Sequence, residues 1–260
     1  MTETPTSQAV EASLAGLRST APQGLAERIL VATGHADQYD TVASTVGALI
    51  VAFTKDGISV VAPADRTDDF SRDYFRFTGR EVTPGRLPTR LRSGVERVLQ
   101  TGKLGSLPVD LSHLTDFQRA VLKKTAEIPR GQMRSYGWIA KEIGNTGAVR
   151  AVGSALNKNP VPVLIPCHRV GKSDGSIGNY AYGPEMKHEL LEHEGLDTES
   201  LLQLAARGIS LTGSDTTSIY CFPTCSHAKR TTEQHRVEFR SVKQAKAAGY
   251  RACKVCRPAA

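Results

Sequence analysis

Four of the five cysteines in this 260-residue chain stand in two close pairs near its C-terminal end, and this spacing constrains the fold most. Three residues separate Cys221 from Cys225, two separate Cys253 from Cys256, and 27 residues lie between the pairs. Four thiolates in this pattern suit a tetrahedral zinc ion, and about fifty residues with little apolar area need such a centre to fold. The alternative is four free cysteines. We predict a small zinc-bound α+β domain.

The placement of the cysteines also bears on the compartment and the partners of the chain. Residues 1–166 contain no cysteine, which suits a reducing compartment and does not suit a disulfide framework. The N-terminus is polar and no apolar run approaches the length of a membrane span, so we expect a cytoplasmic protein without membrane contact. Residues 211–260 hold nine Lys/Arg against three Asp/Glu. This excess of positive charge indicates an anionic partner such as nucleic acid, although solubility alone can also account for it.

The first half of the chain shows the pattern of a small α+β domain. Residues 1–36 predict a short helical extension, with Leu14 and Leu17 among its apolar positions. Residues 87–100 predict a helix, and the charged residues 65–80 predict a solvated loop. Short β-branched or apolar runs predict strands over residues 41–46, 48–53 and 58–62.

From Thr115 onward the pattern is mainly helical. Thr115 and Gln118 have the spacing of a capping box, which predicts a helix start. Residues 136–143 and 148–157 predict two helices joined by a glycine-containing turn, the layout of a helix-turn-helix, although such helix pairs are also common outside DNA-binding proteins. A last helix is expected from Pro184 to Gly195.

Cys167 is the fifth cysteine, and it lies at the end of an apolar run directly before His168. A thiolate is a strong nucleophile and an imidazole can accept its proton, so the pair is a candidate catalytic unit. The alternative is a buried cysteine that acts as a small hydrophobic residue. Glu194 shares a helix face with Leu190 and Leu191, and is either an exposed residue at the helix end or a partner of a cationic group such as His168.

Four short segments of the central region form one recognisable set. They are Arg150-Ala151-Val152-Gly153, Asn159-Pro160-Val161-Pro162, Ile165-Pro166-Cys167-His168-Arg169-Val170 and Gly178-Asn179-Tyr180. Because of these four segments, residues 37–197 closely resemble the O6-alkylguanine-DNA alkyltransferases (methylated-DNA–protein-cysteine methyltransferases). The resemblance implies a ribonuclease-H-like scaffold domain over residues 37–110 and a catalytic, DNA-binding domain over residues 111–200.

The resemblance also implies a reaction. Cys167 would take the alkyl group from O6-alkylguanine in DNA, and from O4-alkylthymine, in a direct displacement without a cofactor. His168, oriented by Glu194, would remove the thiol proton through a water molecule. Tyr136 would protonate or hydrogen-bond the leaving guanine, and Asn159 would brace the turn. Because a thioether is a very poor leaving group, the protein would act once per molecule.

Double-stranded DNA is the implied partner, bound by a monomer through the minor groove. Arg150 would fill the space of the extruded nucleotide, since the target atom cannot be reached inside a stacked duplex. The implied DNA contacts are Arg150, Tyr136, Ala151 and Arg169. The implied pocket residues are Pro162, Val170, Tyr180 and Ala181. Tyr182 stands where some relatives have glycine, which predicts slower repair of large adducts such as benzyl.

Residues 216–260 resemble the zinc-binding methylphosphotriester-repair domain of the adaptive-response protein Ada, after a linker over residues 201–215. The resemblance implies that Cys221 accepts a methyl group from a phosphotriester. The alternative is that this domain only binds DNA or only holds a structural zinc ion, because the segment after Cys225 departs from the expected form. Basic residues that could contact the DNA backbone are Lys229, Arg230, Arg236 and Arg240.

Three other functions compete with this interpretation. A lesion sensor without activity would lack the active cysteine, which is present here as Cys167. A transcription regulator like Ada would need the helical activator domain, which this chain lacks. A cysteine hydrolase would need an oxyanion hole and repeated turnover.

Overall fold

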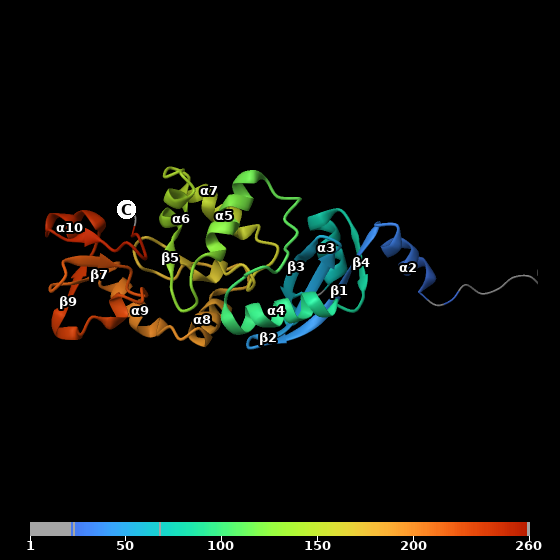
Figure 1. Ribbon diagram of the computed structural model, residues 1–260, viewed down its shortest axis with the longest axis horizontal. Helices are drawn as coiled ribbons and strands as arrows, with labels where there is room; N and C mark the ends of the chain where they lie inside the picture. Colours follow the sequence, from blue (N-terminus) through green and yellow to red (C-terminus); the bar gives the residue numbers. More distant parts are fainter. Residues whose placement is uncertain (1–21, 23, 68, 259–260) are drawn as a thin grey trace, which may run out of the picture.

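The computed structural model describes residues 22, 24–67 and 69–258, and these form three structural units in a row along the long axis of the molecule (Figure 1). A four-stranded sheet lies at the N-terminal end, helices occupy the middle, and a second four-stranded sheet lies at the C-terminal end. This is the α+β fold that the sequence predicts. Of the predicted N-terminal helical extension the structure describes α2 (Leu25–Ala32), whereas Leu14 and Leu17 lie outside the described residues.

The first sheet has the strand order β3-β2-β1-β4, in which β4 is parallel to β1 and the other neighbours are antiparallel. All three predicted strands are present, but the first begins earlier than expected, because Asp37 and Gln38 pair with β4. The strands are β1 (Ala36–Ser44), β2 (Gly47–Thr54), β3 (Gly57–Pro63) and β4 (Glu81–Pro84).

The prediction of a loop over residues 65–80 is wrong, because this stretch contains helix α3 (Phe70–Thr78). Asp69 caps the helix by accepting a hydrogen bond from the amide of Arg72, and Gly79 ends it with a positive φ of 73°. Phe70 and Tyr74, one turn apart, are buried against one face of the sheet. The charged residues between them lie on the outer side of an amphipathic helix.

The middle of the molecule confirms the predicted helices, including the capping box between Thr115 and Gln118. Its main apolar core joins the other face of the first sheet to helices α4 to α7. A short parallel pair of strands, β5 (Arg134–Ser135) and β6 (Val170–Gly171), lies beside these helices. The helices are α4 (Thr89–Thr101), α5 (Asp116–Ala126), α6 (Tyr136–Glu142), α7 (Val149–Asn157), α8 (Pro184–His193) and α9 (Thr198–Ala206).

The C-terminal sheet has the order β10-β8-β7-β9 and carries one short helix, α10 (Val242–Ala247). The prediction of a linker over residues 201–215 is wrong, since α9 fills its first part and β7 is an inner strand of the sheet. Leu211 of β7 is buried in a cluster with aromatic residues of the same unit, which explains why this polar-looking segment is ordered. The strands are β7 (Leu211–Ser214), β8 (Ile219–Cys221), β9 (Arg236–Phe239) and β10 (Arg251–Ala252).

Candidate active site and metal centre

The active-site turn runs from Asn159 to Cys167 and is held by the side chain of Asn159. The amide Nδ2 of Asn159 donates to the carbonyl oxygen of Ile165 at 2.9 Å and lies 3.2 Å from Sγ of Cys167. Its Oδ1 accepts from the amide of Val161 at 3.1 Å. Val163, within this turn, has a φ of 71°, a left-handed conformation that costs energy for a β-branched residue. Asn159 thus contacts the turn, which the resemblance expects it to brace, and also the thiol of Cys167.

Cys167 is the first residue of the 3₁₀ turn η2 (Cys167–Arg169), and its side chain is half-buried. Burial raises the pKa of the Cys167 thiol, while the hydrogen bond from Asn159 and the charge of Lys187 act in the opposite direction. At rest the group is a thiol, so a nucleophilic role requires a base. The nearest candidate in the sequence is the following residue, His168.

His168 and Glu194 form a buried pair. Nε2 of His168 lies 2.9 Å from Oε1 of Glu194, and the imidazole is 1% exposed. Burial opposes ionisation of Glu194, but hydrogen bonds from His168 and Arg169 prevail and lower its pKa to about 2. Since Glu194 is a carboxylate, Nε2 of His168 donates to it, which leaves Nδ1 of His168 as the basic nitrogen. Burial lowers the pKa of His168, so the imidazole is neutral and able to accept a proton.

The structure does not support Arg169 as a DNA contact. Its side chain is 1% exposed and its guanidinium lies against Glu194, with Nη2 to Oε1 at 2.7 Å and Nε to both carboxylate oxygens at 3.0 and 3.1 Å. Nη1 donates to the carbonyl oxygens of Gly102 and Ile128. Arg169 thus neutralises Glu194 from inside the protein. This ion pair could not be predicted from the sequence, because Arg169 and Glu194 lie 25 positions apart.

Lys187 is a buried residue of the candidate site that the sequence analysis did not single out. It is fully buried on α8, and its Nζ donates to the carbonyl oxygens of Val170 and Asn179 at 2.7 and 3.2 Å. Burial lowers the pKa of Lys187 to about 8, and the charge of Cys167 opposes this shift. A buried cation near the thiol favours its ionised form. The only available signal was a lysine beside Met186 on the apolar side of an amphipathic helix.

Aromatic side chains surround the thiol. The rings of Tyr180 and His168 meet edge to face with centroids 6.4 Å apart, and Tyr182 packs against Tyr180 at 5.9 Å. Burial raises the pKa of Tyr136, and the negative charge of an ionised Cys167 raises it further. Tyr136 begins α6, and a Cβ at Gly178 would lie 3.9 Å from its hydroxyl. Of the other predicted pocket residues, Pro162 and Val170 are buried whereas Ala181 is exposed.

The predicted DNA-contacting residues Arg150 and Ala151 lie together at the start of α7. Both are exposed, and α7 packs against α5 and α6 through its opposite, buried side. The two helices α6 and α7 have the layout predicted for a helix-turn-helix. Their exposed edge therefore offers a basic residue to a partner without disturbing the core.

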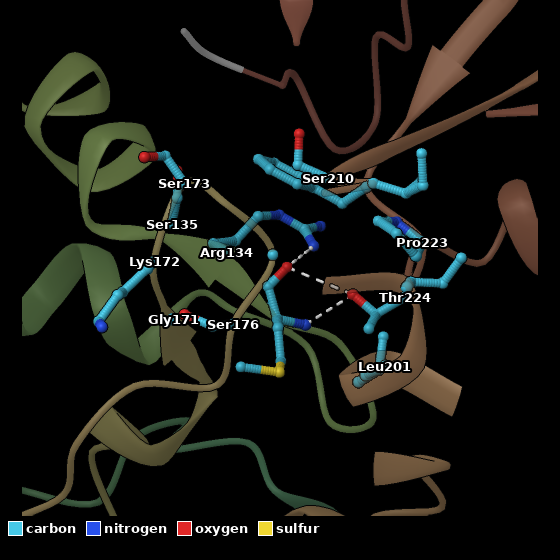
Figure 2. A pocket seen from close by; sticks show the side chains of 15 residues that line it. Arg134, Ser135, Gly171, Lys172, Ser173, Ser176, Leu201, Ser210, Pro223 and Thr224 are labelled. Atoms are coloured by element: carbon cyan, nitrogen blue, oxygen red, sulfur yellow. Dashed lines mark hydrogen bonds between the residues drawn. The ribbon is translucent and has the colours of Figure 1, made fainter. Parts of the chain in front are cut away.

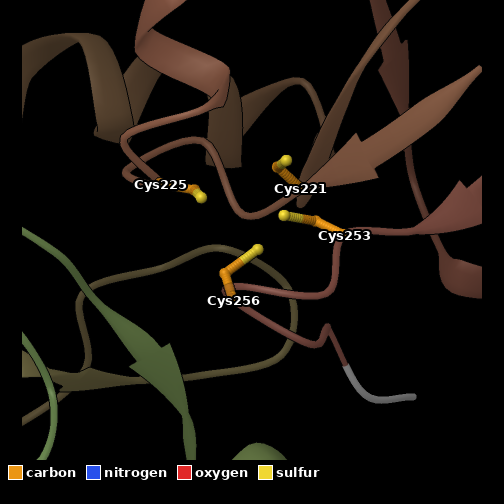
Figure 3. A group of neighbouring side chains, drawn as sticks. All are labelled: Cys221, Cys225, Cys253 and Cys256. Atoms are coloured by element: carbon orange, nitrogen blue, oxygen red, sulfur yellow. The ribbon is translucent and has the colours of Figure 1, made fainter. Parts of the chain in front are cut away.

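The four C-terminal cysteines converge on one point, as Figure 3 shows. Their sulfur atoms all lie within 4.8 Å of one another and all four residues are buried. Zinc–sulfur bonds of about 2.3 Å place the ligands of a tetrahedral site roughly 3.8 Å apart, so this donor set fits zinc.

Cys221 differs from the other three cysteines in its surroundings. It lines a surface hollow formed by polar and basic residues of the C-terminal unit. The residues around it are Ser214, Thr216, Thr217, Ile219, His227, Arg230, Thr231, Thr232 and His235. A negatively charged group on a partner molecule would find hydroxyl, imidazole and guanidinium donors there.

Two known family models match this chain, one over the region of Cys167 and one over the four C-terminal cysteines. Residues 116–196 match the family model described as the DNA-binding domain of 6-O-methylguanine DNA methyltransferase, and residues 203–259 match the metal-binding domain of Ada. A methylated-DNA–protein-cysteine methyltransferase of Methanosarcina barkeri is 35% identical over 167 residues, which cover 60% of this chain and 96% of that relative. The relative of the same name from Shigella flexneri is 47% identical, over 47% of this chain and 72% of that protein. The match to the rat relative, at 50% identity, covers 38% of this chain and 46% of that protein.

A solved structure agrees with these relatives. The crystal structure of Mycobacterium tuberculosis OGT in complex with DNA is 33% identical, with a TM-score of 0.50, over 65% of this chain and 98% of that one. Fold and site together define an α+β protein with one candidate thiol nucleophile and one four-thiolate metal-binding domain. The chain belongs to the methylated-DNA–protein-cysteine methyltransferase family. In the described residues, no helix is long and apolar enough to cross a membrane.

Proposed function

We propose that this protein repairs alkylated DNA by transferring the alkyl group irreversibly to Cys167. The activity is that of the family, and one observation supports the choice of residue. Cys167 lies within 3.2 Å of the Asn159 amide, next to a neutral imidazole that is oriented by an ionised carboxylate. This is the arrangement of a thiol, a base and an orienting group that nucleophilic catalysis requires.

The proton path follows from the tautomer of His168. Nε2 is committed to Glu194, and Nδ1 is buried without a hydrogen-bond partner among the described residues. We infer that a water molecule links Nδ1 to the thiol, takes its proton and passes one to the ring. The imidazolium that forms is stabilised by the carboxylate of Glu194. The positive charge of Lys187 stabilises the resulting thiolate of Cys167.

The displacement itself needs no cofactor. A bond forms between Sγ of Cys167 and the alkyl carbon while the bond from that carbon to O6 of guanine breaks. The leaving guanine gains a proton from the hydroxyl of Tyr136, and the proton that His168 took from the thiol returns to Tyr136 through water, so that no net charge remains. The product is a thioether, which no group in this site can cleave, so each molecule reacts once. O4-alkylthymine is the second expected substrate.

DNA reaches this site by extrusion of the damaged nucleotide from the duplex. In the proposed complex α7 lies in the minor groove, Arg150 occupies the vacated space and Ala151 lies close to the backbone. The backbone carbonyls of Cys167 and Val170 and the amide of Ala181 hold the edge of the guanine, between Pro162 and Tyr180. The protein binds double-stranded DNA as a monomer in the cytoplasm.

The domain limits belong to the same proposal. Residues 37–110 form a ribonuclease-H-like scaffold, supported by the strand order of the first sheet. Residues 111–200 form the catalytic and DNA-binding domain. The zinc domain, placed at residues 216–260 from the sequence, includes β7, and the match to the Ada model begins at residue 203.

We propose further that Cys221 accepts a methyl group from a methylphosphotriester. Its position beside the surface hollow, among donors suited to a phosphate, supports this choice over Cys225, Cys253 and Cys256. Zinc bound by the four cysteines would keep Cys221 ionised at neutral pH. Methylation would replace one thiolate by a neutral thioether and reduce the negative charge that repels DNA.

A peptide mass map tests both acceptors at once. Zinc-loaded protein is mixed with duplex DNA carrying O6-methylguanine and methylphosphotriesters, and methyl groups are scored on the peptides of Cys167 and Cys221. We expect methyl on both, and none at residue 167 in the Cys167→Ser variant. Methyl on Cys167 alone would reduce the C-terminal unit to a DNA-binding or structural domain. Absence of methyl from Cys167 would contradict the main proposal.

A further inference from the structure

The metal-binding unit contacts the central unit across a domain boundary, and Thr224 is its most buried polar contact there. Figure 2 shows Thr224 beside Met133, with the hydrogen bonds between them dashed. The amide of Met133 donates to the hydroxyl of Thr224 at 2.8 Å, and this hydroxyl lies 3.4 Å from the carbonyl oxygen of Met133. Arg134 packs at the same boundary, with its guanidinium carbon 5.6 Å from the ring centroid of Trp138 and 5.5 Å from that of Phe222.

The segment that leads to Met133 depends on this contact. Residues 127–133 link α5 to β5 without forming a helix or strand, and within them Gln132 donates to the carbonyl oxygen of Pro129 at 3.2 Å. The amide of Met133 instead has its partner in the other unit. A buried amide without a partner is costly, so Thr224 fixes the end of this segment.

The other side of the same segment lies against Glu194. The amide of Gly131 donates to Oε2 of Glu194 at 3.2 Å, and Nη2 of Arg130 donates to the carbonyl oxygen of His193 at 2.7 Å. Gly131 has a φ of 68°, and a Cβ there would lie 2.8 Å from the carbonyl oxygen of Glu194, so the approach requires glycine. Lys229 of the metal-binding unit donates to the carbonyl oxygen of Gly131 at 3.3 Å. The turn is thus held between Glu194 and the metal-binding unit.

The Gly131 amide helps to decide how the carboxylate of Glu194 is turned. The last torsion of a glutamate side chain has broad preferences, so its hydrogen bonds set the orientation. Oε2 receives the amide of Gly131 and Nε of Arg169. Oε1 faces Nε2 of His168 at 2.9 Å and Nη2 of Arg169 at 2.7 Å. A shift of Gly131 would therefore turn Oε1 away from His168.

We propose that Thr224 and Lys229 are positioning residues for the reaction of Cys167. They hold the turn of residues 130–133, and through it the carboxylate of Glu194, in the orientation that the neighbouring base needs. This role rests on the proposed function of Cys167 as the alkyl acceptor.

The metal cluster fixes the position of Thr224. Thr224 directly precedes Cys225, which is buried in one cluster with the other three C-terminal cysteines. An intact cluster keeps the hydroxyl of Thr224 against Met133, and loss of the cluster releases it. The reactivity of Cys167 thereby depends on the state of the metal-binding unit.

The test follows Cys167 in the full-length, zinc-loaded protein. Its modification by iodoacetamide is timed over a range of pH by mass mapping of tryptic peptide 159–169, which contains no other cysteine. Methyl transfer from duplex DNA carrying O6-methylguanine is measured in single turnover. Thr224→Val removes the hydroxyl and keeps the shape, whereas Thr224→Ser keeps the hydroxyl. Lys229→Ala is compared with Lys243→Ala, at an exposed lysine of α10.

In Thr224→Val we expect both rates at Cys167 to fall about tenfold, because a small misplacement of an orienting group is costly. The rise of iodoacetamide reactivity with pH should move to higher pH, since a misplaced Glu194 stabilises the imidazolium of His168 less. The charged groups that act on His168 are those of Glu194, Arg169 and Lys187, and every variant keeps them.

The other variants separate positioning from bulk stability. Thr224→Ser should restore most of both rates, and Lys243→Ala should match wild type. Lys229→Ala should slow iodoacetamide modification of Cys167 about threefold, because it removes one partly buried hydrogen bond. This assay contains no DNA, so loss of a DNA contact cannot account for the change. Removal of zinc from the wild type by a chelator should slow Cys167 as Thr224→Val does.

Three outcomes decide the matter. A wild-type rate and pH dependence of Cys167 in Thr224→Val, even with a lower urea midpoint, would show a merely structural contact and overturn the proposal. If Thr224→Val fails to fold, Lys229→Ala decides in the DNA-free assay, where a wild-type rate would overturn it. Slower modification of Cys167 in Thr224→Val, combined with no methyl transfer by wild type, would support the positioning role and contradict only the proposed function.

Discussion

Glu194 lies between a base and a buried cation of the candidate active site. Its carboxylate contacts His168 at 2.9 Å and Arg169 at 2.7 Å. Glu194→Gln would leave Arg169 buried without its counter-charge, which costs about 3–5 kcal/mol. It would also deprive the imidazolium of its stabilising charge, so alkyl transfer should slow about 10²-fold or more. Urea unfolding and a single-turnover transfer assay measure the two effects.

The control for this substitution is Glu189→Gln, which changes an exposed carboxylate of α8, the helix that Glu194 follows. It should leave both properties close to wild type. A Glu194→Gln protein with wild-type stability and transfer rate would show that the buried pair has no function.

The same carboxylate predicts how stability depends on pH. The folded-state pKa of Glu194 is about 2, below the ordinary value of 4.5. A lowered pKa gives stability that is present above the unfolded-state pKa and is lost as pH falls toward the folded-state value. We expect a loss of about 3 kcal/mol between roughly pH 5 and pH 2, read from urea midpoints. In Glu194→Gln this part of the pH dependence should vanish, and its persistence would assign the effect to other groups.

We expect Tyr182 to limit the size of the alkyl group that Cys167 accepts. Its ring packs on Tyr180 near the thiol, and burial raises the pKa of its hydroxyl to about 12, so the group is neutral. Tyr182→Gly would open space beside Cys167 and should raise the ratio of benzyl to methyl transfer about tenfold. Tyr182→Phe keeps the ring and should keep the wild-type ratio. If the glycine variant shows the wild-type ratio, Tyr182 does not set adduct size.

At the scale of elements, the turn from Asn159 to Cys167 depends on one amide side chain. Asn159→Ala would remove the partners of the Ile165 carbonyl and the Val161 amide, at a cost of about 1–3 kcal/mol. It would also remove the donor that favours the thiolate, so reaction of Cys167 with iodoacetamide should slow. Asn157→Ala, at the exposed end of α7, is the matched control. Wild-type thiol reactivity in Asn159→Ala would contradict this role.

The elements also show how far the sequence could predict the structure. Helices with local signals, such as the capping box at Thr115 and the proline start at Pro184, lie where the pattern predicted them. Helix α3 was missed because charged residues outnumber its two buried aromatic positions. Strand β7 was missed because its burial depends on partners later in the chain, such as Phe239.

In the candidate sites, too, some residues could be predicted from local sequence patterns and others could not. The cysteine spacing predicted the metal centre, and the motif around Cys167 predicted the pair of His168 and Glu194. The buried roles of Arg169 and Lys187 could not be predicted, because a charged residue is expected at the surface unless its distant partner is known. Their partners lie on other elements, and only the folded chain brings them together.

At the scale of the whole molecule, zinc should stabilise the C-terminal unit specifically. The cluster of Cys221, Cys225, Cys253 and Cys256 is one of only two small cores in this unit among the described residues. Removal of zinc by a strong chelator should unfold residues 203–258 and leave the first sheet and its helices intact. Limited proteolysis should then yield a stable N-terminal fragment, and added zinc should reverse the change. A C-terminal unit that resists protease equally without zinc would contradict this dependence.

The contacts across the domain boundary matter to anyone who cuts this chain into parts. Removal of the residues after about 203 would strip Met133 of its Thr224 partner and open buried Arg134 and Trp138 to water. Met133 lies two residues after Gly131, whose amide donates to Glu194 at 3.2 Å. Truncation therefore changes a segment that contacts the candidate active site. Its repair rate is therefore a poor baseline for the intact molecule. An uncut chain with serine in place of Cys221 is the sounder reference.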